Sequence, residues 1–333
     1  MLPLKILFDI LHVAHLNFFN SAIKSLKARH DVSAVVRQRG NLVAIAESDL
    51  PCSFRVMGTH RTGVRKMVGV WERVVDLKKI VCEMETDVLA SCGFYSGIVS
   101  RFCRVRSVIF YDDFEYKLNF WPCLLFAHQL VLPEALGVAG RNIIQYNGFK
   151  ELAYLNRFVP QPKILDEYGV QLGEYVFVRY VAPISMNYRR LGQEEVTQAT
   201  NAILNTGMII IASLERGINL EFEHPNFRKV VEPCSSIHSL IYYSALVVTT
   251  GDTVAREGAL LGVPTIYLGR REMRINRELV ESGQLIIPDP GKMTKEILAN
   301  LSNRVPRVKP ENKKWDDTTE VIVSCIEQQK FTK

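Results

Sequence analysis

The stretch Leu246-Val-Val-Thr-Thr-Gly-Asp-Thr-Val-Ala-Arg-Glu-Gly-Ala-Leu-Leu-Gly-Val-Pro264 passes from an apolar, β-branched run through a turn of small residues into a helical pattern. We expect a buried strand over 246–249, because a short apolar run bounded by turn residues is typical of a parallel sheet. A helix then begins near Thr253 and ends before Gly262 and Pro264, which are stop signals for a helix. The stretch therefore predicts a strand–turn–helix unit of an α/β fold.

The turn of this unit is a candidate phosphate site. Backbone amides at the start of a helix have no partner within the helix, and together with the helix dipole they attract anions. We expect Gly251, Asp252 and Thr253 to hold a diphosphate there. Glu257 follows one turn later and can reach a ribose diol with its two oxygens. The alternative is an ordinary unit in which Asp252 or Thr253 only caps the helix.

Apolar runs alternate with helical stretches along the rest of the chain as well. Such alternation predicts right-handed parallel units and doubly wound sheets. In the first half we expect strands over 5–9, 32–36, 53–56, 88–91, 107–111 and 130–132, with helices over 17–29, 64–85 and 95–102. In the second half we expect strands over 175–179, 208–212, 230–231, 246–249, 265–268 and 285–287, with a helix over 194–205.

A polar connection between positions 146 and 173 interrupts this alternation, and the chain of 333 residues is long enough for two domains. We expect an α/β protein with two Rossmann-like, doubly wound domains facing a cleft. The domains are expected at 1–157 and 173–310, with a last helix over 315–330 packing back on the first. Ligands of such sheets bind beyond the carboxyl ends of the strands, so the site is sought in the loops that follow strands.

The composition excludes several other classes of protein. Hydrophobic residues make up 47% of the chain and charged residues 23%, which is ordinary for a soluble globular protein. The seven cysteines are scattered and form no Cys-x-x-Cys pair, so neither a zinc site nor a regular disulfide framework is expected. No stretch is apolar over the length of a membrane span. We therefore expect a cytoplasmic protein with reduced thiols.

The segment 246–264 resembles the signature of GT-B nucleotide-sugar proteins, including MurG-type glycosyltransferases and non-hydrolysing UDP-N-acetylglucosamine 2-epimerases. The resemblance implies that the turn holds the diphosphate and that Glu257 holds the ribose. In those families the turn is usually richer in glycine or serine, and Asp252 departs from that pattern. The resemblance also implies a UDP-sugar as substrate, no separate cofactor, no bound metal and no nucleic-acid partner.

Further motifs resemble a prokaryotic GT-B-like family designated domain of unknown function 354. This resemblance spans nearly the whole chain and implies the GT-B fold. The matching segments are 8–20 (Phe-Asp-Ile-Leu-His-Val-Ala-His-Leu-Asn-Phe-Phe-Asn), 111–116 (Tyr-Asp-Asp-Phe-Glu-Tyr), 146–155 (Tyr-Asn-Gly-Phe-Lys-Glu-Leu-Ala-Tyr-Leu) and 178–183 (Val-Arg-Tyr-Val-Ala-Pro) with Tyr188.

His15 is the candidate general base, because it follows the first expected strand and glycosyl transfer needs a group that removes the acceptor hydroxyl proton. His12 competes for this role or contacts the acceptor. The alternative for either histidine is a helix cap or a satisfied loop residue.

Asp112, Asp113 and Glu115 follow the strand expected over 107–111. Paired carboxylates can bind a divalent metal, act as an acid/base pair or hold sugar hydroxyls. We favour contact with the acceptor or sugar, with Glu115 in a catalytic position, and the alternative is that they cap the next helix.

Two arginines are candidates for the donor phosphates. Arg179 ends the first strand of the second domain, and Arg216 follows the next strand. A guanidinium at either place can neutralise the diphosphate that leaves.

Three functions remain open: a glycosyltransferase in surface-glycan synthesis, a UDP-sugar 2-epimerase and a non-catalytic nucleotide-sugar-binding protein. The epimerases carry a histidine shortly after the second strand of their C-terminal domain. The corresponding stretch 212–217 (Ala-Ser-Leu-Glu-Arg-Gly) has none, and His224 follows several residues later. We therefore favour transfer to a saccharide or lipid-linked acceptor.

The formal net charge is +6, and the segment 55–79 carries seven bases against two acids. These bases have no matching acids in the pattern, so we expect peripheral contact with the inner face of the membrane, driven by anionic lipids. The alternative is a solvated helix face. The bases are Arg55, Arg61, Arg65, Lys66, Arg73, Lys78 and Lys79.

Overall fold

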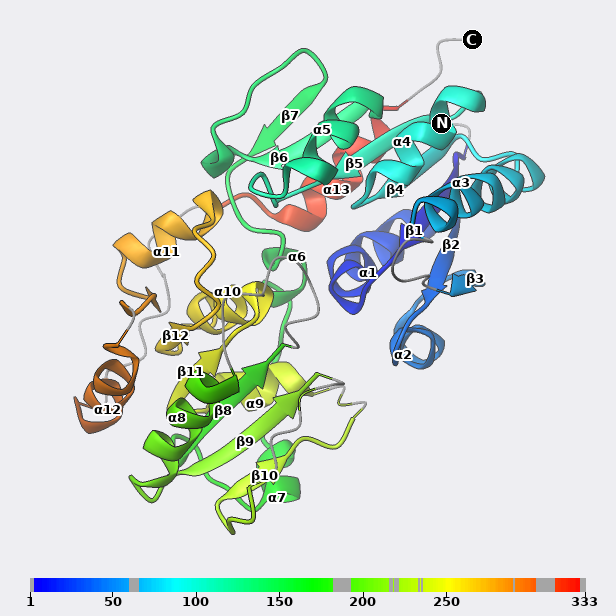
Figure 1. Ribbon diagram of the computed structural model, residues 1–333. Helices are drawn as coiled ribbons and strands as arrows, with labels where there is room; N and C mark the ends of the chain where they lie inside the picture. The colour runs from blue at the N-terminus through cyan, green and yellow to red at the C-terminus, as the bar shows by residue number, and fades with distance from the viewer. Residues whose placement is uncertain are drawn as a thin grey trace. The chain divides into compact units, whose positions relative to one another are not determined.

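The computed structural model describes residues 3–59, 66–181, 193–215, 218, 222–232, 234, 236–289, 291–303 and 315–329. The chain divides into two compact units (Figure 1). The first unit comprises Met1–Arg157 and Trp315–Lys333, and the second comprises Phe158–Lys314.

The first unit is built on a parallel sheet of seven strands in the order β3-β2-β1-β4-β5-β6-β7. Six of them lie where the apolar runs predict strands. The seventh, β7, was missed because it is only four residues long and contains the exposed Gln145. The strands are β1 Lys5–Ile10, β2 Asp31–Gln38, β3 Ser53–Thr59, β4 Val88–Ser91, β5 Arg106–Phe110, β6 Gln129–Pro133 and β7 Ile143–Tyr146.

Helices cover both faces of this sheet, because its strands carry apolar side chains on both faces and each set must be buried. One core contains Phe8 of β1, Phe19 of α1 and Ile322 of α13. The opposite core contains Leu7 of β1, Leu77 of α3 and Val99 of α4, and α5 packs beside α4. The helices are α1 Val13–Lys27, α2 Leu42–Asp49, α3 Lys66–Glu83, α4 Phe94–Phe102, α5 Lys117–Phe126, α6 Leu152–Leu155 and α13 Thr318–Glu327.

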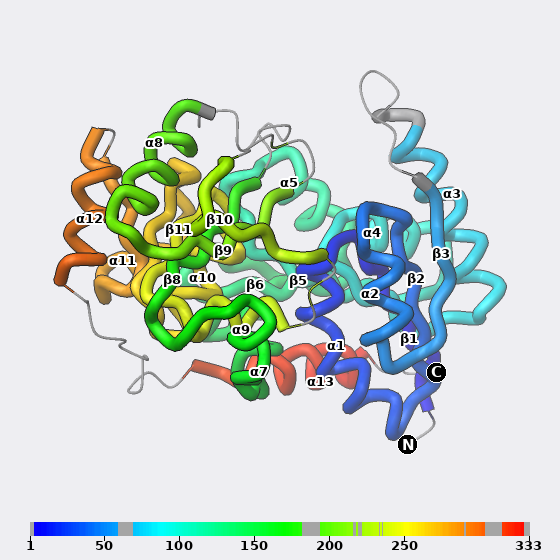
Figure 2. The backbone as a smooth tube through the Cα atoms, turned by 90° about the horizontal axis from the view of Figure 1, so that it is seen from below, coloured from blue at the N-terminus to red at the C-terminus, as the bar shows by residue number. Residues whose placement is uncertain are grey.

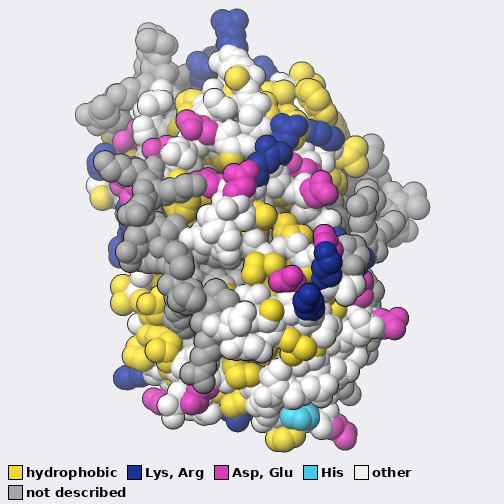
Figure 3. Space-filling view, turned by 90° about the vertical axis from the view of Figure 1, so that its left-hand side faces the viewer, with side chains coloured by type: hydrophobic (Ala, Val, Ile, Leu, Met, Phe, Trp, Pro, Cys, Tyr) yellow, Lys and Arg dark blue, Asp and Glu magenta, His cyan; other side chains and the backbone are white. Residues whose placement is uncertain are grey.

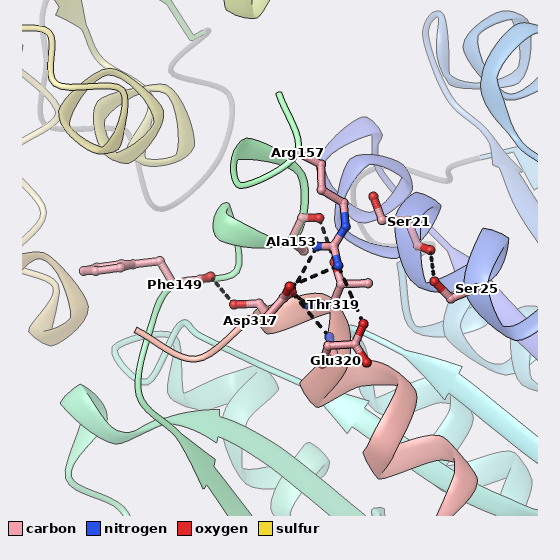
Figure 4. A network of polar contacts seen from close by, with 9 residues as sticks. Ser21, Ser25, Phe149, Ala153, Arg157, Asp317, Thr319 and Glu320 are labelled. Atoms are coloured by element: carbon pink, nitrogen blue, oxygen red, sulfur yellow. Dashed lines mark hydrogen bonds and ion pairs between the residues drawn. The ribbon is translucent and has the colours of Figure 1, made fainter. Parts of the chain in front are cut away.

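The C-terminal helix α13 lies beside α1 in the first unit (Figure 2). Its N-cap Asp317 accepts hydrogen bonds from the backbone N–H groups of Thr319 and Glu320, and Arg157 forms two 3.0 Å hydrogen bonds with the same carboxylate (Figure 4). The Thr319 hydroxyl donates to the Ala153 carbonyl at 2.9 Å. These contacts join the end of the chain to the segment around α6.

The second unit is built on a parallel sheet of six strands in the order β10-β9-β8-β11-β12-β13. The strand expected over 230–231 is wrong: β10 ends one residue earlier, and Val231 is 77% exposed. The β-branched side chains of Val230 and Val231 resemble a strand locally, but only Phe227–Lys229 pair in register with β9. The Val230 N–H still donates to the Ala212 carbonyl of β9 at 2.8 Å, just after β10 ends. The strands are β8 Tyr175–Tyr180, β9 Ile209–Leu214, β10 Phe227–Lys229, β11 Leu246–Thr249, β12 Thr265–Tyr267 and β13 Leu285–Ile286.

Helices α8 and α12 cover one face of this sheet, where Ile203 and Ile297 join the core, and α10 packs against β11, β12 and α9. The connection between the two sheets contains the short helix α7, although the sequence predicted only a polar linker there. The helices are α7 Lys163–Tyr168, α8 Gln193–Leu204, α9 Ile237–Tyr243, α10 Asp252–Leu260, α11 Arg277–Glu281 and α12 Met293–Asn303.

Basic and acidic side chains are interspersed over the face shown in Figure 3. Within the described ranges, no helix combines the length and the apolar character that a membrane span requires.

Candidate functional site

The turn between β11 and α10 is bonded to the end of β8. The Thr250 N–H donates to the Arg179 carbonyl at 3.0 Å, and the Val181 N–H donates to the Thr250 hydroxyl at 2.7 Å. A Cβ on Gly251 would lie 2.9 Å from Cγ2 of Val181, so this approach requires glycine. The Gly251 N–H donates to the Thr249 hydroxyl at 3.0 Å. The turn therefore holds the start of α10 in a defined position beside β8.

Helix α10 begins at this turn with Gly251 as its N-cap residue. Gly251 has no side chain that could accept from the amides of the first turn. The alternative in which Asp252 or Thr253 is the cap residue places the cap one or two residues too late. A helix start without a side-chain cap has backbone donors and a positive dipole end to offer an anion. This is the geometry that a phosphate site requires.

Asp252 is buried at the start of α10. Its carboxylate accepts hydrogen bonds from the Tyr267 hydroxyl and from Nη1 of Arg271, the latter at 2.7 Å. The Arg271 guanidinium compensates the negative charge, which would otherwise repel a phosphate at the helix start. Asp252 thus joins α10 to β12 and the segment that follows it, and the sequence motif alone did not indicate this ion pair.

Glu257 lies one turn into α10, where only 4% of the residue is exposed. Nε2 of His238, on α9, lies 3.1 Å from Oε1 of Glu257. The His238 ring also contacts Phe158, with 6.0 Å between ring centroids. The histidine therefore fixes the orientation of the carboxylate. Sequence reasoning missed His238, because nothing in the pattern links it to a residue 19 positions later.

Arg179 lies near the carboxyl end of β8, paired in register with Ser213 of β9 and Thr249 of β11. Its Nη1 donates to the Ser213 hydroxyl at 2.7 Å, and Glu232 lies 4.0 Å away. The Ser213 hydroxyl in turn donates to Glu232 at 3.0 Å. Arg179 is thus placed at the edge that carries the α10 turn. The other candidate arginine, Arg216, and the family-motif residue Tyr188 lie outside the described residues.

In the first unit, His12 is the N-cap residue of α1 and His15 lies in the first turn of that helix. The Leu11 N–H donates to Nδ1 of His15 at 3.4 Å, and Nη1 of Arg39 lies 2.9 Å from the ring nitrogens of His12. Burial lowers the pKa of His15 to about 3, with Lys150, Arg39 and Arg73 adding to the effect. The imidazole is therefore neutral near neutral pH. It is a weak base until an anion offsets these cations.

A buried ion pair lies next to the histidines. Asp9 of β1 is fully buried and accepts a hydrogen bond from Arg73 of α3, which is 8% exposed. Burial raises the pKa of Asp9, and Arg73 opposes that shift. The Arg73 guanidinium also lies 5.4 Å from the ring centroid of Tyr95. Sequence reasoning missed this pair, although an aspartate inside an apolar strand was a usable signal.

The acidic loop after β5 is tied to its surroundings. Oδ2 of Asp112 lies 2.9 Å from Nζ of Lys150, which follows β7, and Oδ1 of Asp113 accepts from the Tyr116 N–H at 3.2 Å. Glu115 is partly buried in the same loop, and α5 begins at Lys117 without a side-chain cap. Within the described ranges, no group of three or more His, Cys, Asp or Glu side chains is arranged to hold a metal ion.

The carboxyl ends of the strands in the first unit thus bring His12, His15, Asp112 and Lys150 to one edge of its sheet. Burial lowers the pKa of both histidines, and the cations Lys150 and Arg39 add to each shift.

The basic segment 55–79 is less cationic than its composition suggests. Arg55 pairs with Glu83 at 2.7 Å, Lys79 lies 3.9 Å from the same carboxylate, and Arg73 faces the interior. Arg61, Arg65 and the side chain of Lys66 lie outside what the structure describes. The expectation that these bases have no matching acids is therefore wrong for three of them.

Comparison with known proteins places the chain in a family. Residues 4–330 match the family described as "Protein of unknown function (DUF354)". The chain belongs to this family. It is also 24% identical to uncharacterized protein MJ0665 of Methanocaldococcus jannaschii over 86% of this chain and 88% of that protein.

Solved structures share the fold of this chain. A Staphylococcus aureus MnaA–UDP structure has a TM-score of 0.76 and 14% identity, covering 98% of this chain and 96% of that one. A UDP-GlcNAc 2-epimerase of M. jannaschii, in complex with UDP-GlcNAc and UDP, has a TM-score of 0.74 and 13% identity over 97% and 99%. The spinosyn forosaminyltransferase SpnP has a TM-score of 0.67 and 14% identity over 98% and 99%. This DUF354 protein therefore has the GT-B fold with two Rossmann-like domains.

Proposed function

We propose that this DUF354 protein is a glycosyltransferase that moves a sugar from a UDP-sugar to a saccharide or lipid-linked acceptor in surface-glycan synthesis. The observation that carries the proposal is the start of α10, where the N-cap residue is glycine and the buried Glu257 follows one turn later. Solved proteins of the same fold contain UDP or UDP-GlcNAc, which supports a nucleotide of this class.

The donor is assigned to the second unit. The backbone amides of Asp252 and Thr253 bind the diphosphate next to Gly251, whose own N–H donates to the Thr249 hydroxyl. Arg179 offsets the charge that develops on the diphosphate as the sugar leaves. Glu257, oriented by His238, accepts hydrogen bonds from the ribose hydroxyls. Arg216 is proposed as a second cation at the same edge.

The acceptor is assigned to the first unit. His15 removes the proton from the attacking hydroxyl, and an anionic substrate group beside Lys150 and Arg39 raises the pKa of its imidazole toward the working range. His12, Asp112, Asp113 and Glu115 contact the acceptor sugar, with Glu115 closest to the reacting hydroxyl in this proposal. The protein acts in the cytoplasm, at the inner face of the membrane, without a metal ion.

A UDP-sugar 2-epimerase is the second candidate, because several solved proteins of this fold are epimerases. His224 is the residue that would have to replace the missing epimerase histidine. It is exposed and precedes β10, so it lies at the amino end of a parallel strand. The α10 turn follows a strand at the carboxyl edge of the same sheet. This placement favours transfer over epimerisation.

Deuterium incorporation separates the two reactions. The protein is incubated with UDP-GlcNAc in heavy water, first alone and then with a lipid or polysaccharide extract as the source of acceptor. Transfer predicts release of UDP that depends on the extract, without deuterium at C2 of the sugar. Deuterium at C2 in the absence of extract would establish the epimerase and overturn the proposal.

A further inference from the structure

Three large apolar side chains stand exposed along α5. Leu118, Trp121 and Leu125 are 68%, 59% and 67% exposed. Their spacing places them within about 60° of one another around the helix axis. The opposite side of the helix buries Phe120 and Cys123. We call these three residues the α5 stripe. Exposed apolar rows of this kind mark contact surfaces, because water penalises them in a free monomer.

The neighbouring helix α4 lies beside α5. It packs closely against α5, since a Cβ on Gly97 would lie 2.9 Å from Cβ of Phe126. Nη2 of Arg101 donates to the Leu125 carbonyl at 3.3 Å, which places this arginine at the end of the α5 stripe. Phe102 follows at the end of α4 with 60% of its surface exposed.

Cations border the stripe along α4 and α5, whereas the acidic residues Asp113 and Glu115 lie just before the start of α5. Neither α4 nor α5 contains an acidic residue. Exposed cations lie in these helices, in the turn between α4 and β5 and at the start of β5: Arg101, Arg104, Arg106 and Lys117. Lys117 begins α5, four residues before Trp121, so it lies on a neighbouring part of the helix surface. The surface therefore combines an apolar row with a cationic border.

We propose that the α5 stripe docks on an anionic lipid bilayer. Trp121 lies at the level of the head groups, Leu118 and Leu125 enter the acyl boundary, and the cations contact lipid phosphates. A second copy of the chain fits this surface less well, because a two-fold contact sets the same patch against itself. Arg101, Arg104 and Lys117 would then face their own equivalents, with no acid on α4 or α5 to compensate them.

This docking places the acidic loop near the membrane. Helix α5 begins two residues after Glu115, so a bilayer on the stripe lies close to the loop assigned to the acceptor. If the proposed function holds, the acceptor is therefore a lipid-linked sugar rather than a soluble one. The docking itself does not depend on that function.

Vesicle flotation of the full chain tests the docking. The vesicles contain phosphatidylcholine with about 30% phosphatidylglycerol. Each base near an anionic leaflet raises partitioning about fivefold, and salt screens this attraction, so flotation is compared at low and at physiological ionic strength. We expect wild-type binding that weakens with salt. Replacing two large side chains, Trp121→Ser with Leu125→Ser, is expected to lower partitioning about tenfold or more. Arg104→Glu with Lys117→Glu is expected to lower it at least about fivefold.

The matched control is Leu172→Ser in the second unit, because Leu172 has the same 59% exposure as Trp121. We expect it to float like the wild type. All of these positions are exposed, so unchanged melting temperatures and unchanged UDP affinity verify that the variants are folded. Loss of UDP binding in Glu257→Gln tests the proposed function and leaves flotation unaffected.

Three results would overturn the docking. The first is the absence of flotation at low ionic strength, and the second is equal flotation of the stripe variant and the wild type. The third is a wild-type dimer that Trp121→Ser converts into a monomer, which would make a second copy the occupant of the stripe.

Discussion

Replacing Glu257 by glutamine tests how the second unit holds a nucleotide. The substitution keeps the shape of the side chain but removes its charge. Glu257 is 4% exposed and its Oε1 lies 3.1 Å from Nε2 of His238, so the carboxylate is held in one orientation. A neutral histidine can donate to either side chain, and we therefore expect little change in fold stability.

The magnitude follows from the burial of this carboxylate. Hydrogen bonds to a charged group contribute about 1.5–3 kcal/mol. If the ribose hydroxyls donate to Glu257, Glu257→Gln should weaken UDP binding by about 10- to 150-fold. Calorimetry with UDP measures this loss. Glu167→Gln on α7, which is exposed, is the matched control and should bind UDP like the wild type.

A deoxynucleotide separates contact with the ribose from a general electrostatic effect. The wild type should bind 2′-deoxy-UDP more weakly than UDP, whereas Glu257→Gln should bind the two with nearly equal affinity. If the substitution weakens both nucleotides by the same factor, Glu257 does not contact the 2′-hydroxyl. Unchanged UDP affinity in a folded variant would refute the assignment of the nucleotide to α10.

Three further predictions concern the other site residues. His15→Ala should lower the turnover rate by about 10²–10⁴-fold and leave the dissociation constant of UDP unchanged; normal turnover with a lower melting temperature would identify a structural histidine. Burial lowers the pKa of His15 to about 3 in the folded chain. As the pH falls below the ordinary histidine pKa, His15 therefore takes up a proton in the unfolded chain but not in the folded one. Wild-type stability should therefore fall with pH from about 6.5 toward 3, and His15→Gln should show a shallower decline in melting temperature; identical slopes would contradict this account. Arg179→Gln should weaken the binding of UDP about tenfold and change the binding of uridine little, because only UDP carries the charge that the guanidinium offsets. Calorimetry with both ligands measures this difference. Equal losses for both would indicate that Ser213 and Glu232 fully engage this arginine.

Local patterns in the sequence were sufficient for the architecture. The strand–turn–helix unit over 246–264, its small-residue turn and the alternation around it depend on residues that are neighbours along the chain, so their signals can be read without the fold. The same patterns missed β7 and misplaced β10, because a short strand is defined by its partner as much as by its own residues. The position of Glu257 one turn into α10 was also predictable, since helix geometry alone determines it.

The partners of the candidate residues depended on the tertiary structure. His238 beside Glu257, Arg271 beside Asp252 and Lys150 beside Asp112 are contacts between elements far apart in the sequence. Arg73 belonged to a basic run in the sequence, but the packing of α3 on the sheet turns it inward to Asp9. The same effect leaves Leu118, Trp121 and Leu125 exposed on a helix rich in apolar residues. Composition gives the polarity of a helix, whereas its rotation against the sheet decides which side chains face solvent, and only the packed core sets that rotation.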